Sequence, residues 1–158
     1  MVEKPILATN IDGFLIKHQA FIKPHKLWFK RAIMLLKDPS LKHWIGKKDY
    51  FKGVNEIMKR IMPNASDKQR TKQARDWYQQ DVINYIKFNQ ETVFKNIAKT
   101  LIKLKDKFTL ALITTNTKEH IHQILEAANL KGIYDIIFAT SSSEKPDKAD
   151  LFQKFSKQ

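Results

Sequence analysis

Two polar residues and a glycine follow the first apolar segment of the chain and form its most informative pattern. The segment 6–11 carries Asn10 near its end, and Asp12 and Gly13 come directly after it. Phosphoryl transfer through an aspartyl-phosphate needs a carboxylate nucleophile, and a second carboxylate nearby can exchange protons with the leaving group and with water. Glycine lets the backbone turn tightly and approach a phosphate closely. An ordinary turn is the alternative interpretation, because asparagine and aspartate favour turns in any protein.

Two further polar segments follow the next apolar segments along the chain. Thr115 comes after the segment 109–113, with Thr114 as its alternative. A helix that begins at Asn116 would present free N–H groups to an anion. Lys145 follows a third apolar segment, and a lysine can bind phosphate as a point charge. Each pattern also has a plain interpretation, namely a helix cap for the threonine or asparagine and a solvated surface position for the lysine.

The apolar segments themselves predict the elements that position these residues. Three of them predict buried strands, at 6–11, 109–113 and 134–139. The first is apolar enough to be buried on both faces, as parallel strands are. Helical spacing of apolar residues predicts helices after the first two motifs, over 93–104 and 116–128, and a last helix from about residue 146. Strands that alternate with helices indicate an α/β fold with a parallel sheet, and ligands bind at the carboxyl ends of its strands.

The middle of the chain differs in pattern and in charge. Apolar residues recur there at helical spacing over 27–36, 50–62 and 66–86, without a strand pattern. We therefore predict an α/β core from 1–15 and 91–158 with a helical insert at 16–90. The net charge is +13, and residues 16–108 alone carry 22 Lys and Arg against eight Asp and Glu. Such a basic surface attracts polyanions and anionic substrates alike.

Taken together, the three polar segments resemble the motifs of the haloacid dehalogenase-like (HAD) phosphatases, in their order and in their position after successive strands. The resemblance covers nearly the whole chain and implies a parallel, Rossmann-like three-layer core in which residues 16–90 form a helical cap. It places Asn10 at the position of the nucleophile and Asp12 at that of the general acid/base. It also implies a Mg²⁺ ion at Asn10 and at Asp12, through the Asp12 side chain or backbone carbonyl, with the carbonyl of Ile11 as a further ligand.

The same resemblance implies the groups that bind phosphate. Thr115, or Thr114 in its place, would hydrogen-bond the phosphoryl group, and Lys145 would neutralise its charge. Gly13 would let the backbone approach the phosphate closely, and the helix that begins at Asn116 would present its N–H groups to it.

Three departures from the family pattern bear on activity. Asn10 lacks the negative charge of an aspartate, so it is a poor nucleophile and a weak ligand for a hard dication. Phe14 stands where the family has a small threonine or valine. The fourth motif, an acidic pair after a fourth strand, is absent, so we expect a C-terminally shortened core in which the edge of the first strand is exposed.

The composition of the chain excludes several kinds of site and segment. The chain has no cysteine, which excludes disulfides and thiolate metal sites, and no two of its five histidines have a convincing metal spacing. No apolar run reaches the length of a membrane span, and the N-terminus lacks the pattern of a signal peptide, which favours the cytoplasm.

We interpret the chain as a HAD-like hydrolase, a Mg²⁺-dependent phosphomonoester phosphatase that acts on a small phosphorylated metabolite through an aspartyl-phosphate and is impaired by Asn10. The first alternative is a pseudoenzyme that binds phosphorylated ligands without turnover. The second is a nucleic-acid-binding module that uses the basic insert. Its expected phosphate contacts are Lys47, Lys48, Lys68, Arg70, Lys72 and Arg75.

Overall fold

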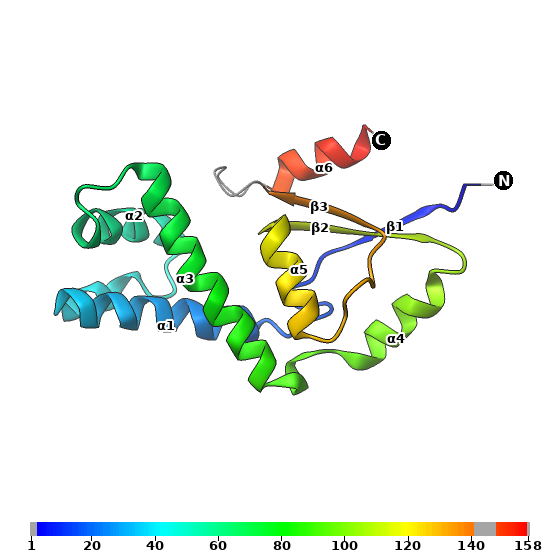
Figure 1. Ribbon diagram of the computed structural model, residues 1–158, viewed down its shortest axis with the longest axis horizontal. Coiled ribbons are helices and arrows are strands. Elements are labelled where there is room, and N and C mark those ends of the chain that lie inside the picture. Colours follow the sequence, from blue (N-terminus) through cyan, green and yellow to red (C-terminus); the bar gives the residue numbers. More distant parts are fainter. Residues whose placement is uncertain (1–2, 141–147, 158) are drawn as a thin grey trace. The chain divides into compact units, whose positions relative to one another are not determined.

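The computed structural model describes residues 3–140 and 148–157 (Figure 1). The chain divides into two compact units. One, here the α/β unit, comprises Met1–His18 and Ile86–Gln158, and the other, here the helical unit, comprises Gln19–Tyr85. The sequence predicts an insert at 16–90, whereas the helical unit spans 19–85.

A sheet of three parallel strands lies at the centre of the α/β unit. The strands β1 (Ile6–Thr9), β2 (Thr109–Thr117) and β3 (Ile136–Thr140) follow one another across the sheet in that order. β2 is the central strand, and its residues Leu110 and Leu112 are fully buried. The predicted parallel α/β fold is therefore confirmed.

The first strand is less buried than predicted. β1 lies at the edge of the sheet, where the sequence led us to expect an exposed edge, because only β2 pairs with it among the described residues. Ile6 is 47% exposed, and the other residues of β1 are half-buried. The apolar character of this segment alone could not reveal that one side of the strand has no neighbour.

Helices cover the sheet on both sides. The helices α5 (Lys118–Ala127) and α6 (Lys148–Ser156) both contact β2 and β3, and Figure 1 shows them on opposite sides of the sheet. α5 buries Ile121, Ile124 and Leu125, which lie on one face of the helix. The helix α4 (Lys95–Leu104) precedes β2 and follows a short 3₁₀ helix, η2 (Gln90–Thr92). Because β1 and β2 run parallel, their carboxyl ends lie at the same edge of the sheet.

The helical unit has a core of its own. It consists of α1 (Gln19–Leu36), the 3₁₀ helix η1 (Pro39–Trp44), α2 (Tyr50–Ile61) and α3 (Asp67–Phe88), the last of which runs on into the α/β unit. The buried side chains that these helices share are Trp28, Phe29, Ala32, Leu41, Ile57, Met58 and Ala74. Among the described helices, none combines the length and the apolar character that a membrane-spanning helix needs.

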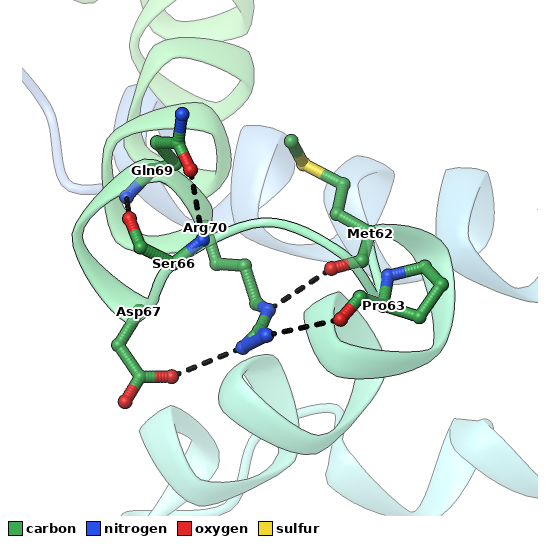
Figure 2. Close-up of polar contacts among 6 residues, drawn as sticks. All are labelled: Met62, Pro63, Ser66, Asp67, Gln69 and Arg70. Atoms are coloured by element: carbon green, nitrogen blue, oxygen red, sulfur yellow. Dashed lines mark hydrogen bonds and ion pairs between the residues drawn. The ribbon is translucent and has the colours of Figure 1, made fainter.

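Polar contacts fix the connection between α2 and α3 (Figure 2). The backbone N–H of Ser66 donates to the side chain of Gln69 (2.8 Å), and the N–H of Gln69 donates to the hydroxyl of Ser66 (3.2 Å). This reciprocal pair is a capping box, which satisfies two N–H groups at the start of α3. Arg70 donates to the carbonyls of Met62 (3.1 Å) and Pro63 (3.4 Å), so its guanidinium holds the end of α2.

Candidate active site

The segment after β1 folds into a tight loop that holds the first predicted site residues. The N–H groups of Leu15 and Ile16 both donate to the carbonyl of Ile11 at 3.0 Å, and the N–H of Gly13 donates to the carbonyl of Ile16 at 2.8 Å. Gly13 has a φ of +74°, a conformation that residues with a side chain rarely adopt. The loop is anchored because Ile11, Leu15 and Ile16 are almost fully buried.

Asn10 contacts the loop that it precedes. Its side-chain Nδ2 donates to the backbone carbonyl of Asp12 at 3.0 Å. An aspartate at this position would have no such donor, so the hydrogen bond is specific to the amide. The carbonyl that the sequence suggested as a metal ligand is thus already hydrogen-bonded.

Asp12 has a partner that the sequence did not reveal. The Nδ1 atom of His18 lies 2.8 Å from one carboxylate oxygen of Asp12 and 2.9 Å from the other. Both side chains are partly exposed, His18 at 64% and Asp12 at 41%. The loop returns the chain to Asp12 six residues later, a contact that no periodic pattern in the sequence signals.

The end of β2 supplies the second group of predicted residues. Asn116 donates to the hydroxyl of Thr114 twice, from its backbone N–H (3.1 Å) and from its side chain (3.0 Å), and Thr114 is buried. Thr115 is half-buried, and its hydroxyl has no hydrogen-bond partner within 3–140 and 148–157. Of the two threonines, Thr115 is therefore the one whose hydroxyl is available to a ligand.

The helix after β2 is capped one residue later than predicted. Thr117, not Asn116, is the N-cap of α5, and its hydroxyl accepts a hydrogen bond from the N–H of His120 (3.3 Å). The reason is local, because the side chain of Asn116 is engaged by Thr114 and cannot cap the helix. The strand also runs on to Thr117 through an irregularity in its pairing with β3.

Lys145 lies outside the described residues, as does the segment 141–147 around it. Its predicted role in phosphate binding stays a prediction.

The strands hold the loop after β1 close to the end of β2. Thr9 pairs with Leu112, which places Asn10 beside the next residue of β2, Ile113. The hydroxyls of Thr9 and Tyr134 lie 2.6 Å apart and form a hydrogen bond. Burial raises the pKa of Tyr134, so its phenol stays protonated and able to donate.

An apolar cavity of about 840 Å³ lies beside β1 in the α/β unit. Asn10, Thr9 and Phe14 line it together with side chains of α4, among them Ile97 and Leu101. The cavity therefore lies next to the candidate site, since Asn10 belongs to both.

Most of the chain, from residue 18 onward, matches a known family. The family described as haloacid dehalogenase-like hydrolase matches residues 18–158. The chain belongs to this family. The match begins after the loop of residues 10–13, so the roles of Asn10, Asp12 and Gly13 stay predictions.

Solved structures agree with this HAD-like fold. A haloacid dehalogenase-like hydrolase from Streptococcus pneumoniae is 18% identical, with a TM-score of 0.57 over 98% of this chain and 69% of that one. A predicted phosphatase from Clostridium acetobutylicum is 21% identical, with a TM-score of 0.57 over 99% and 70%. CbbY from Rhodobacter sphaeroides, solved in complex with phosphate, is 16% identical, with a TM-score of 0.53 over 97% and 71%. A comparison with curated proteins gave no match.

The loop of this HAD-like chain does not fit the metal that the family generally uses. HAD family members are generally Mg²⁺-dependent. Asn10 offers an amide in place of a carboxylate, and its N–H occupies the carbonyl of Asp12. Within the described part of the chain, no group of three or more His, Cys, Asp or Glu side chains could hold a metal ion. Of the two residues at the predicted Mg²⁺ site, only Asp12 therefore offers a carboxylate, and His18 contacts it.

The basic residues expected to contact nucleic acid are partly engaged within the helical unit itself. Arg70 binds two carbonyls and pairs with Asp67 (3.1 Å), and Lys72 pairs with Asp76 (2.6 Å). Arg75 is half-buried, and burial lowers its pKa. Lys47, Lys48 and Lys68 are exposed. Three of the six cations are thus held by the scaffold, which weakens the nucleic-acid alternative.

Proposed function

We propose that the site at the carboxyl ends of β1 and β2 is that of a phosphomonoester phosphatase acting on a small phosphorylated metabolite, and that Asn10 impairs its first step. The proposal is supported by the parallel pairing of β1 and β2, because Asn10 and Asp12 follow β1 and Thr115 lies near the end of β2. Membership of the HAD-like hydrolases supports it, as does the phosphate bound to CbbY.

The impaired step is the attack on phosphorus. In an Asn10→Asp variant, a carboxylate oxygen of residue 10 attacks the phosphorus, and the bond to the leaving oxygen breaks with its electron pair. Asp12 lies two residues further on, where it can give a proton to that oxygen if the leaving group needs one. The neutral amide of Asn10 has no such nucleophilic oxygen, so the chain as it stands does not form the acyl phosphate.

The second step regenerates the site. A water oxygen attacks the phosphorus of the acyl phosphate while the carboxylate of Asp12 takes a proton from that water. The bond between phosphorus and the carboxylate of residue 10 breaks, and inorganic phosphate leaves. The hydroxyl of Thr115 would donate to a phosphoryl oxygen throughout.

The test is phosphate release from an aryl phosphate by the native chain and by Asn10→Asp, each with and without Mg²⁺. We expect phosphate release by Asn10→Asp and none by the native chain. The exposed Asn55 of the helical unit provides a matched control, because Asn55→Asp makes the same chemical change away from the site. Equal activity in all three proteins, or silence in all three, would contradict the proposal, and silence would direct attention to ligand binding without turnover.

A further inference from the structure

We propose that His18 is a positioning residue that holds Asp12 as the proton acceptor for the second step. This inference rests on the proposed function. A carboxylate only accepts hydrogen bonds, so the Nδ1 atom of His18, at 2.8 and 2.9 Å from its two oxygens, must carry the proton. His18 therefore orients the carboxylate that accepts a proton from water in the second step.

The loop makes this contact well defined although both side chains are partly exposed. The N–H of Lys17, next to His18, donates to the carbonyl of Thr92 at 2.8 Å. The N–H of Phe94 donates to the carbonyl of Leu15 at 2.9 Å, which ties the same strip of backbone to the segment before α4. The backbone between Asp12 and His18 is thus fixed at Leu15 and Lys17, which limits how far the two side chains can move apart.

The backbone carbonyl and the side-chain carboxylate of Asp12 are held by different residues. Asn10 binds the carbonyl and His18 binds the carboxylate. An aspartate at position 10 removes the first contact and leaves the second unchanged. The role of His18 can therefore be measured in the Asn10→Asp background.

The two steps of the reaction use Asp12 differently. Kinetics can therefore distinguish a His18 that positions Asp12 from a His18 that only supports the fold. An aryl phosphate has a good leaving group, so the first step needs no proton from Asp12. The second step needs Asp12 as a base for any substrate. Loss of the His18 contact should then lower kcat and leave kcat/KM for the aryl phosphate unchanged, because kcat/KM reports only the events up to formation of the acyl phosphate.

Two amide substitutions test which ring nitrogen matters. In Asn10→Asp, the further change His18→Asn places a side-chain N–H near the position of Nδ1, whereas His18→Gln places it near that of Nε2. We expect His18→Gln to lower kcat about tenfold and to accumulate phosphorylated enzyme in quenched samples, and His18→Asn to retain most of kcat. His43 is the matched control, since it is exposed and its Nδ1 lies 2.7 Å from the carbonyl of Ser40 in the helical unit. His43→Gln should leave both parameters unchanged.

A fall of kcat and kcat/KM by the same factor in His18→Gln, or equal effects of His18→Asn and His18→Gln, would overturn the inference. A second measurement does not depend on turnover. Nitrogen NMR of the native chain, at a pH where the ring is neutral, should show the proton of His18 on Nδ1, and Asp12→Leu should shift it toward Nε2. A native ring protonated on Nε2 would overturn the role of His18 even if Asn10→Asp is active. Absence of turnover in Asn10→Asp, with the proton on Nδ1, would instead count against the proposed function alone.

Discussion

The two units of this chain differ in their charge and in the partners of their charged side chains. The helical unit carries 15 Lys and Arg against six Asp and Glu, including all four arginines of the sequence. Arg31, Arg60 and Arg70 form ion pairs inside that unit, with Asp81, Asp38 and Asp67. The α/β unit has fewer cations, yet it holds Asp12 and His18 at the end of a strand, where ligands of such sheets bind.

This contrast teaches that net charge does not locate the candidate site. Most of the excess positive charge belongs to a unit whose arginines hold helices together. The groups that could do chemistry lie in the unit with the more even charge balance, and one of them, the hydroxyl of Thr115, has no partner among the described residues.

Removal of the Asp12 carboxylate should have the largest effect. In the Asn10→Asp background, Asp12→Asn should lower kcat by about 10²–10⁴-fold, because proton transfer in both steps loses its carboxyl group. Phosphate release from an alkyl phosphate measures this loss. Asp106→Asn is the control, since Asp106 is an exposed aspartate of the same unit. A similar fall of kcat in both variants would show that Asp12 acts as an ordinary surface charge and not as a site residue.

Loss of the Trp28 side chain should have the largest effect on stability. Trp28 is 4% exposed in the core of the helical unit, and its Nε1 donates to the carbonyl of Ala74 at 3.2 Å. Trp28→Ala should lower the free energy of unfolding by about 3–5 kcal/mol. Denaturant unfolding measures the change, and Leu27→Ala, at a position that is 47% exposed on the same helix, should cost far less. Equal losses would contradict the assignment of this core.

Removal of the Ser66 cap should have an intermediate effect. Ser66→Ala deletes one half of the capping box at the start of α3 and should cost about 1 kcal/mol of unfolding free energy. Thermal unfolding with Asn64→Ala, at an exposed position in the same connection, provides the comparison. A neutral result for Ser66→Ala would show that Arg70 alone fixes the connection.

The ion pair of Asp38 should give the smallest effect, and one that depends on pH. The pKa of Asp38 lies below its ordinary value of about 3.8. The main cause is the hydrogen bond from the hydroxyl of Ser40, and the hydrogen bond from Arg60 is the second. A lowered pKa in the folded state contributes stability above the ordinary pKa, and this stability is lost as the pH falls through the folded value. Asp38→Asn should therefore slightly reduce stability at neutral pH and flatten its decline below about pH 4. Asp49→Asn, at an N-cap whose side chain makes no cap hydrogen bond, should not flatten it.

The sequence predicted the regular elements well because their cause is local. Apolar spacing located the three strands of the described residues and most of the helices, although α1 begins at residue 19 and not near the predicted 27. The succession of strands and helices implied the parallel sheet that the structure contains. The exposed edge of β1 was expected from the absent fourth strand pattern, whereas the incomplete burial of its faces was missed, because the apolar character of residues 6–11 does not encode it.

The candidate site was predictable only where residues adjacent in sequence form it. Asn10, Asp12 and Gly13 stand together, so their shared loop could be inferred. The pairing of His18 with Asp12 depends on how the loop closes around the carbonyl of Ile11, which no spacing rule gives. The shift of the α5 cap from Asn116 to Thr117 likewise follows from a side-chain contact formed only in the folded chain.

The most direct test of the account is the site of phosphoryl attachment. Asn10→Asp and the native chain would be mixed with an aryl phosphate, quenched in acid and digested, and their peptides analysed by mass spectrometry. The account predicts one phosphoryl group on residue 10 of the variant and none on the native chain. A phosphoryl group on any other residue, or the same labelling of both proteins, would contradict it.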